Sequence, residues 1–259
     1  MAPSKVIFFL STGRTGTKAL AEGLEGNGIV SVHQPPYSRI LTIASNYYLH
    51  GWLPRFALVK LTEWIRLKQI DSANGHTYVQ VFALDHLAAK IVTEKRPDTL
   101  IVHMIRDPRT FVPSYINWSH TRFKSFVANK FVVGWHPSGY FTGKLSWQAW
   151  QEMNELQRVC WHWVYKNQML ASLFADYPGY KCIRFEDLFL GNESHNILRE
   201  LLDFLGIRFE ERFAVIYQQE KNTSRKSFFP RWVQWTSKQQ EQLFDICGPL
   251  MQHYGYGLQ

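Results

Sequence analysis

Short runs of apolar residues recur along the chain, and stretches with helical periodicity separate them. Runs bounded by turn residues predict buried strands, whereas apolar residues spaced by three and four predict amphipathic helices. The five predicted strands cover residues 6–10, 28–33, 78–82, 100–105 and 180–185. Because strands alternate with helices, we expect an α/β fold with a mostly parallel sheet flanked by helices on both faces.

Two stretches interrupt this alternation. Residues 38–74 mix large apolar side chains with Arg and Lys and predict one or two amphipathic helices that cap the site. Residues 117–150 are rich in Trp, Phe and Gly without clear periodicity, which favours a loop or lid over a helical pair. A length of 259 residues fits one core. We therefore expect one domain, 1–259, with substrate-facing insertions at 37–74 and 117–145. Long helices are predicted over 146–175 and 237–254.

A glycine- and hydroxyl-rich turn, residues 11–18, follows the first predicted strand and precedes the first predicted helix. Gly13 and Gly16 allow the main chain to fold closely around an anion, at which the first helical N–H groups point. The charges and hydroxyl groups of this loop come from Arg14, Thr15, Thr17 and Lys18. The pattern of nucleotide-triphosphate loops requires glycine where Thr12 and Thr17 stand. Taken alone, the stretch also fits a plain strand-to-helix turn with a Ser or Thr cap.

Polar residues follow three other predicted strands, and ligands of parallel α/β sheets bind where strands end. His33 ends the second strand, and Asp85 and His86 follow the third; these last two are equally suited to capping the next helix. Arg106 leaves the fourth strand, and Ser114 comes eight residues later. We expect Arg106 and Ser114 to converge on one anion beside the loop.

Composition narrows the partners without choosing among them. The chain has 29 Lys and Arg against 21 Asp and Glu, a net charge of +8 that favours an anionic ligand, a nucleic acid or an acidic surface. Its three cysteines lack metal-ligand spacing. No stretch approaches the ~18 apolar residues of a membrane span, and the initial apolar run does not read as a signal peptide. A cytoplasmic location is therefore the expectation.

Three separated pieces together resemble the sulfotransferases that use 3′-phosphoadenosine 5′-phosphosulfate (PAPS). The first is the loop 11–18, with Arg14 where many members have Lys, and the second is Arg106 with Ser114. The third comprises Arg184-Phe185-Glu186-Asp187-Leu188, Phe204-Leu205-Gly206, Ser224-Arg225-Lys226 and Tyr254-Gly255-Tyr256. The Arg-Asp-Pro-Arg form after the fourth strand looks closer to the bacterial, carbohydrate and tyrosyl-protein branches than to the cytosolic phenol and steroid branch.

The resemblance implies a P-loop-like three-layer fold, PAPS as sulfuryl donor and its bisphosphate PAP as product. The acceptor would be a hydroxyl or amine of a small molecule, lipid or sugar, with no metal and no nucleic-acid partner. The 5′-phosphosulfate would be held by Arg14, Thr15, Gly16, Thr17 and Lys18. The 3′-phosphate would be held by Arg106, Ser114, Arg225 and Lys226. Phe185 replaces a Tyr of many members, so that hydroxyl's contact is not expected.

Catalysis by such an enzyme rests on positioning and charge stabilisation, as in phosphoryl transfer. Lys18 or Arg14 would neutralise the leaving phosphate. His33 is the first choice of general base, and Asp85 and His86 are the alternatives. Two other functions stay open: a P-loop kinase, disfavoured by the missing glycines, and a non-enzymatic module that binds anions or nucleic acid.

Overall fold

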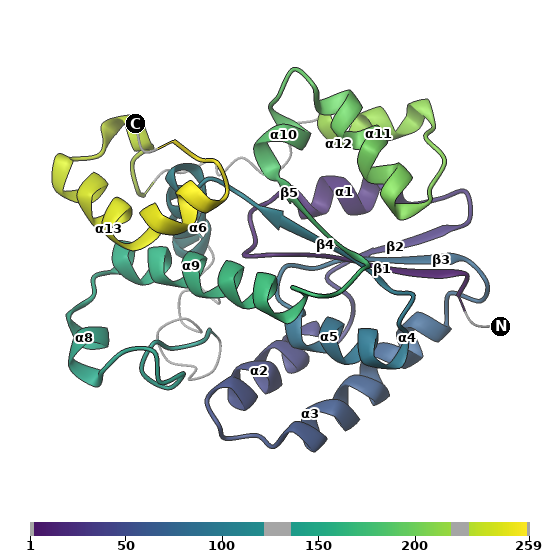
Figure 1. Cartoon of the computed structure of the whole chain (residues 1–259), viewed down its shortest axis with the longest axis horizontal. Helices are drawn as coiled ribbons and strands as arrows, with labels where there is room; N and C mark the ends of the chain where they lie inside the picture. The colour runs from purple at the N-terminus through teal and green to yellow at the C-terminus, as the bar shows by residue number, and fades with distance from the viewer. Residues whose placement is uncertain (1–2, 122–135, 219–227, 258–259) are drawn as a thin grey trace.

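The computed structural model describes residues 3–121, 136–218 and 228–257. Its centre is a five-stranded sheet in which every pair of neighbours is parallel, in the order β2-β3-β1-β4-β5 (Figure 1). The strands are β1 (Lys5–Ser11), β2 (Ile29–His33), β3 (Thr77–Val81), β4 (Leu100–Ile105) and β5 (Tyr180–Arg184). The predicted α/β class and all five predicted strands are confirmed.

The first strand lies at the centre of the sheet. It pairs with β3 on one side, where Phe9 faces Val81, and with β4 on the other, where Phe9 faces Val102. Helices cover both faces of the sheet, so the consecutive apolar residues Val6 to Leu10 are all buried. The loop that follows β1 therefore emerges at the middle of the carboxyl edge.

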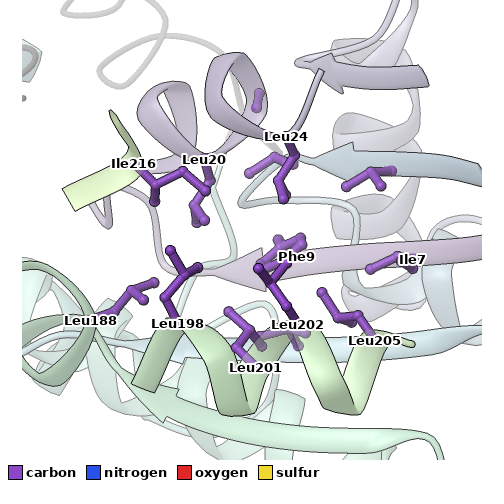
Figure 2. Close-up of a cluster of buried hydrophobic side chains, with 14 of the residues drawn as sticks. Ile7, Phe9, Leu20, Leu24, Leu188, Leu198, Leu201, Leu202, Leu205 and Ile216 are labelled. Carbon is purple, nitrogen blue, oxygen red and sulfur yellow. The ribbon is translucent and has the colours of Figure 1, made fainter. Parts of the chain in front are cut away.

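Successive residues of β1 serve two different cores. Ile7 and Phe9 pack between α1 (Thr17–Leu24) and α11 (Ser194–Leu205), as Figure 2 shows. Val6, Phe8 and Leu10 face the opposite layer. The first layer also contains α10 (Phe185–Phe189), η2 (Glu211–Ala214) and α12 (Val215–Gln218), and the second α4 (Lys68–Asp71), α5 (His86–Lys95) and α9 (Glu155–Leu173). The result is a three-layer arrangement.

A third cluster lies beyond the end of β4. There α6 (Pro108–Thr121) packs against α9 and α13 (Ser237–His253) around the fully buried Trp163. The short helix η3 (Trp232–Gln234) packs against this cluster through Trp232, and α8 (Trp147–Glu152) contacts α9 through the rings of Trp150 and Trp161. This cluster fixes the direction in which α6 leaves the sheet, and hence the position of Ser114.

The amphipathic stretch predicted over 38–74 forms a helical hairpin. Its first arm is α2 (Ser38–Leu49), and its second runs through α3 (Arg55–Thr62), the π-helical segment η1 (Glu63–Leu67) and α4. The inner side of the hairpin packs through Ala44 and Leu58 against Leu87 and Ile91 of α5. Helix α5 thus lies between the sheet and the α2–α3 part of the hairpin (Figure 1), whereas α4 packs against the sheet itself through Ile70.

Two predicted boundaries are wrong. The helix predicted over 146–175 is two helices, because Asn154 and Gln157 form a capping box that begins α9 after α8 has ended. Helix α6 continues to Thr121, so the first residues of the stretch predicted as a loop are helical. Residues 122–135 of that stretch lie outside the described residues.

Candidate active site

The glycines of the loop after β1 are required by its backbone. Gly13 has a φ of 93° and Gly16 a φ of 71°, values that L-residues with side chains rarely adopt. Gly16 is also the N-cap of α1, and a Cβ there would lie 2.5 Å from Cζ of Phe189. The close turn thus depends on glycine for conformation and for space.

Hydroxyl groups hold the loop from inside. Oγ of Ser11 accepts hydrogen bonds from the N–H of Gly13 at 3.0 Å and from Oγ1 of Thr15 at 2.8 Å. Thr15 is fully buried, and its hydroxyl serves to hold the loop. Oγ1 of Thr12 is buried and has no hydrogen-bond partner among the described residues. The first turn of α1 adds backbone N–H groups without helical partners.

Arg106 and Ser114, which follow β4, both contact Arg14 of this loop. Nε of Arg14 donates to Oγ of Ser114 at 3.1 Å, joining residues 100 positions apart. The guanidinium of Arg106 donates to the carbonyl oxygen of Arg14 and, through Nε, to Oγ1 of Thr110 at 3.0 Å. Its carbon lies 4.5 Å from the centre of the Phe185 ring, within cation–π range. Arg106 and Ser114 therefore both contact Arg14 of the loop, and their convergence on one anion stays a prediction.

The third motif braces the turn that carries Arg106. Oε1 of Glu186 accepts the N–H of Asp107 at 3.0 Å, and Oε2 accepts the hydroxyl of Tyr256 at 2.9 Å. Burial raises the pKa of Glu186. Arg184 donates to the carbonyl oxygen of Gly255. The sequence did not indicate this bracing role, because Asp107, Glu186 and Tyr256 lie far apart in the chain.

His33 lies next to the loop at the end of β2. Its Nε2 is 3.2 Å from Oγ1 of Thr17. Partial burial and the nearby charge of Lys18 lower the pKa of His33, while Glu22 opposes them. Lys18 is half exposed and lies 3.5 Å from a carboxylate oxygen of Glu22. A histidine with a pKa below its usual value is neutral at pH 7 and able to accept a proton.

Asp85 and His86 lie inside the protein. Asp85 is fully buried, forms an ion pair with the fully buried Arg66 and accepts a hydrogen bond from Gln80 at 2.6 Å. It occupies the N-cap position of α5 without making a side-chain cap bond. His86 is 1% exposed, and its Nε2 lies 2.9 Å from the carbonyl oxygen of Ser11. Burial lowers the pKa of His86 well below its usual value. Neither side chain faces solvent.

The backbone around this site is strained. Five non-glycine residues of the described chain have positive φ, and two of them, Asn27 and Asn74, belong to a residue type that tolerates it. The other three are Arg14 at 58°, Gln34 at 54° and Tyr37 at 61°. All three belong to the loops that follow β1 and β2, and strain of this kind clusters at functional sites. Nothing in the sequence signals it.

A buried lysine lies near three histidines, one of which, His86, contacts the carbonyl oxygen of Ser11. Lys166 of α9 is 3% exposed and forms none of the ion pairs found among the described residues. It lies within electrostatic range of His86, His136 and His162. Burial lowers the pKa of Lys166 to about 8. The helix predicted over 146–175 gave no sign of a buried ammonium group.

Other expectations concern residues or groups beyond this geometry. Arg225 and Lys226 lie outside the described residues. Within residues 3–121, 136–218 and 228–257, no cluster of His, Cys, Asp and Glu suits a metal ion. In the same part of the chain, no helix combines the length and apolar character that crossing a membrane requires.

Two solved sulfotransferases share this fold over nearly the whole chain. The sulfotransferase domain from the curacin biosynthetic pathway is 16% identical, with a TM-score of 0.55 and 100% of both chains covered. Mouse sulfotransferase SULT7A1, solved in complex with PAP, is 14% identical, with a TM-score of 0.51 and coverage of 97% of this chain and 89% of that one. No protein-family model and no curated protein sequence matches this chain. The likeness therefore shows the fold.

Proposed function

We propose that the protein transfers a sulfuryl group from PAPS to a hydroxyl or amine of a small-molecule, lipid or sugar acceptor. The observation that supports this most is the contact of Arg14 with both Ser114 and Arg106 at the loop after β1. It joins two anion-binding groups, and PAPS carries two separate anionic groups. The fold likeness to sulfotransferases, one of them bound to PAP, supports the same donor.

The residues at the loop fit an anionic nucleotide. Gly16 allows the loop to turn closely with a positive φ, and Thr12 has a buried hydroxyl oxygen without a partner in the described chain. The 5′-phosphosulfate would be held by the backbone N–H groups from Arg14 to Lys18 and by the Arg14 and Lys18 side chains. The 3′-phosphate would be held by Arg106 and Ser114, with Arg225 and Lys226 added from outside the described residues.

The donor supplies the sulfuryl group when bound, and the protein's part is to hold charge and move a proton. Arg14 and Lys18 would stabilise negative charge on the leaving phosphate. Nε2 of His33 would accept the proton of the acceptor, because the lowered pKa leaves it neutral and its place beside Thr17 puts it at the loop. We place His33 ahead of Asp85 and His86 because those two side chains are buried.

The acceptor would enter from the side of the second strand. The loop after β2 continues directly into α2, so the hairpin within residues 37–74 borders the end of β2. We retain the proposal that this stretch and residues 117–145 are substrate-facing insertions in one domain.

Thermal unfolding in the presence of candidate ligands tests the proposal. PAPS and PAP should raise the melting temperature, whereas ATP and an oligonucleotide should not. Arg106→Ala should lose this shift, measured from its own ligand-free value, because its guanidinium would no longer meet the 3′-phosphate. Arg96→Ala is the matched control, since Arg96 pairs with Asp71 on the surface. A shift with ATP alone would favour a kinase, and a shift with the oligonucleotide alone a nucleic-acid-binding module.

Activity is then measured as formation of PAP from PAPS with panels of hydroxyl and amine acceptors. Acceptor-dependent PAP formation that His33→Ala lowers at least ~10²-fold is the expected result. If PAP stabilises the protein but no acceptor class gives turnover, nucleotide binding would be supported and the proposed sulfuryl transfer would be refuted.

A further inference from the structure

The outer side of the α2–α3 hairpin exposes an unusual number of large apolar side chains. The described chain has ten exposed large hydrophobic residues, and five fall within the 28 residues from 37 to 64. These five are Tyr37, Ile40, Trp52, Phe56 and Trp64. Large patches of exposed apolar side chains on proteins often mark interaction sites.

Aromatic and lysine side chains alternate along the second arm of the hairpin. Phe56, Lys60, Trp64 and Lys68 recur every four residues, and all four are exposed, with Phe56 at 72% and Trp64 at 58%. The π segment η1 has more residues per turn than an α-helix, so side chains spaced by four drift less around the axis. Nζ of Lys68 lies 6.0 Å from the Trp64 ring centre. We call these four residues the aromatic–lysine stripe.

An apolar groove lies between the two arms of the hairpin. It has a volume of about 430 Å³ and is lined by Ile40, Ile43, Ala44, Tyr47, Leu53, Ala57 and Leu61. The Tyr37 ring lies 6.5 Å from the Trp64 ring, which joins the start of α2 to the stripe. Tyr37 is four residues beyond His33, so this apolar face begins beside the candidate site.

The charge of the hairpin is positive. Residues 37–71 contain five Lys and Arg against two Asp and Glu. One of the five, Arg66, is buried on Asp85, and Glu63 bridges Lys60 at 3.2 Å and Lys95 at 3.1 Å. Arg55 pairs with Glu94 of α5. Helices that lie in the plane of a membrane interface combine Trp or Phe with Lys on adjoining positions, and acidic lipids attract such lysines.

We propose that the aromatic–lysine stripe and the adjoining groove dock onto an anionic lipid bilayer. Phe56 and Trp64 would enter the headgroup region, while Lys60 and Lys68 would meet acidic headgroups. A neutral ligand would give Lys68, which forms none of the ion pairs found among the described residues, no opposite charge. A second copy of the chain would bring like charge, because the net charge is +8, so an anionic lipid surface fits better than either. This inference is independent of the proposed sulfuryl transfer, because binding to a bilayer requires neither nucleotide nor turnover.

Co-sedimentation with vesicles tests the inference. The protein should pellet with vesicles of phosphatidylcholine and phosphatidylserine, bind phosphatidylcholine alone weakly, and lose binding as salt is raised. Phe56→Ser with Trp64→Ser should weaken binding roughly tenfold or more, because two apolar side chains no longer leave water. Lys60→Gln with Lys68→Gln should remove the preference for phosphatidylserine. Trp147→Ser, a 55% exposed tryptophan on α8, is the matched control and should bind like the parent.

Two results would overturn the inference. Absence of pelleting, or equal binding by the stripe variants and the parent, would show that this face does not meet lipid. Light scattering that gives a dimer abolished by Phe56→Ser with Trp64→Ser would assign the face to a second copy. Unchanged thermal unfolding of all variants, expected for exposed positions, confirms that a loss of binding is not a loss of folding.

Discussion

Replacing Lys166 by methionine should stabilise the protein at neutral pH. Methionine has a similar length without the charge, and Lys166 is 3% exposed with no ion-pair partner in the described chain. Burial lowers its pKa from the usual 10.5 to about 8. Each unit of this pKa shift corresponds to ~1.4 kcal/mol, so burying the ammonium group lowers the free energy of unfolding by roughly 3 kcal/mol at pH values where both the folded and the unfolded chain are protonated.

The pH dependence of this gain has a definite sign. Below about pH 8 the folded and unfolded chains both carry the proton, so the full penalty is present and Lys166→Met gains most. As pH rises from about 8 toward 10.5, the folded protein loses a proton that the unfolded chain retains, so the parent becomes more stable. The difference between variant and parent should therefore shrink as pH rises through this window.

Urea unfolding near pH 7 and near pH 10 measures this difference. We expect Lys166→Met to be more stable by roughly 2 to 3 kcal/mol near pH 7 and by less than about 1 kcal/mol near pH 10. Lys238→Met, at an exposed lysine of α13, is the control and should change little at either pH. A destabilised variant, or an equal difference at both pH values, would show that the ammonium group is not desolvated and would refute the reasoning.

Three further predictions concern His33, Gly16 and Asp85. Turnover should fall as pH drops through a value below 6.5, because the lowered pKa of His33 is where the base becomes protonated, and His33→Ala should lose this limb while keeping nucleotide affinity. Gly16→Ala should lower the free energy of unfolding by more than ~1 to 2 kcal/mol, the cost of placing a residue with a side chain in the left-handed region, because its Cβ would also clash with Phe189. Adding Phe189→Ala should recover part of the lost free energy. Additive effects of the two substitutions in a double-mutant cycle would exclude the steric contact. Asp85→Asn should cost roughly 3 to 5 kcal/mol of unfolding free energy, because Arg66 would keep a buried charge without its partner, and an unfolding midpoint like the parent's would contradict this.

The features that sequence predicted are those with a local or topological cause. Residues 6–10 are consecutively apolar because both faces of β1 are covered, and such a run is readable by itself. The contact of Arg14 with Ser114 joins distant residues, yet both follow ends of neighbouring parallel strands, so the edge of the sheet brings them together.

What sequence did not predict depends on packing between helices. Asp85 follows a strand in the way that functional carboxylates do, and only the docking of the α2–α3 hairpin brings Arg66 onto it. Gln34 and Tyr37 have no sequence signature for positive φ. The break before α9 is different: Asn154 and Gln157 carry the spacing of a capping box, and the prediction of one helix over 146–175 overlooked that signal.

The central position of β1 also sets an order of events during synthesis. This strand is made first, yet its neighbours are β3 and β4, and Lys5 pairs with Thr77 while Ile7 pairs with Leu100. At translation rates of roughly 5 to 20 residues per second, its apolar residues wait several seconds for both partners. Five consecutive apolar residues without charge form an aggregation-prone segment until they are paired. We therefore expect the nascent chain to depend on chaperones until β4 emerges, and the anion loop to acquire its shape only then.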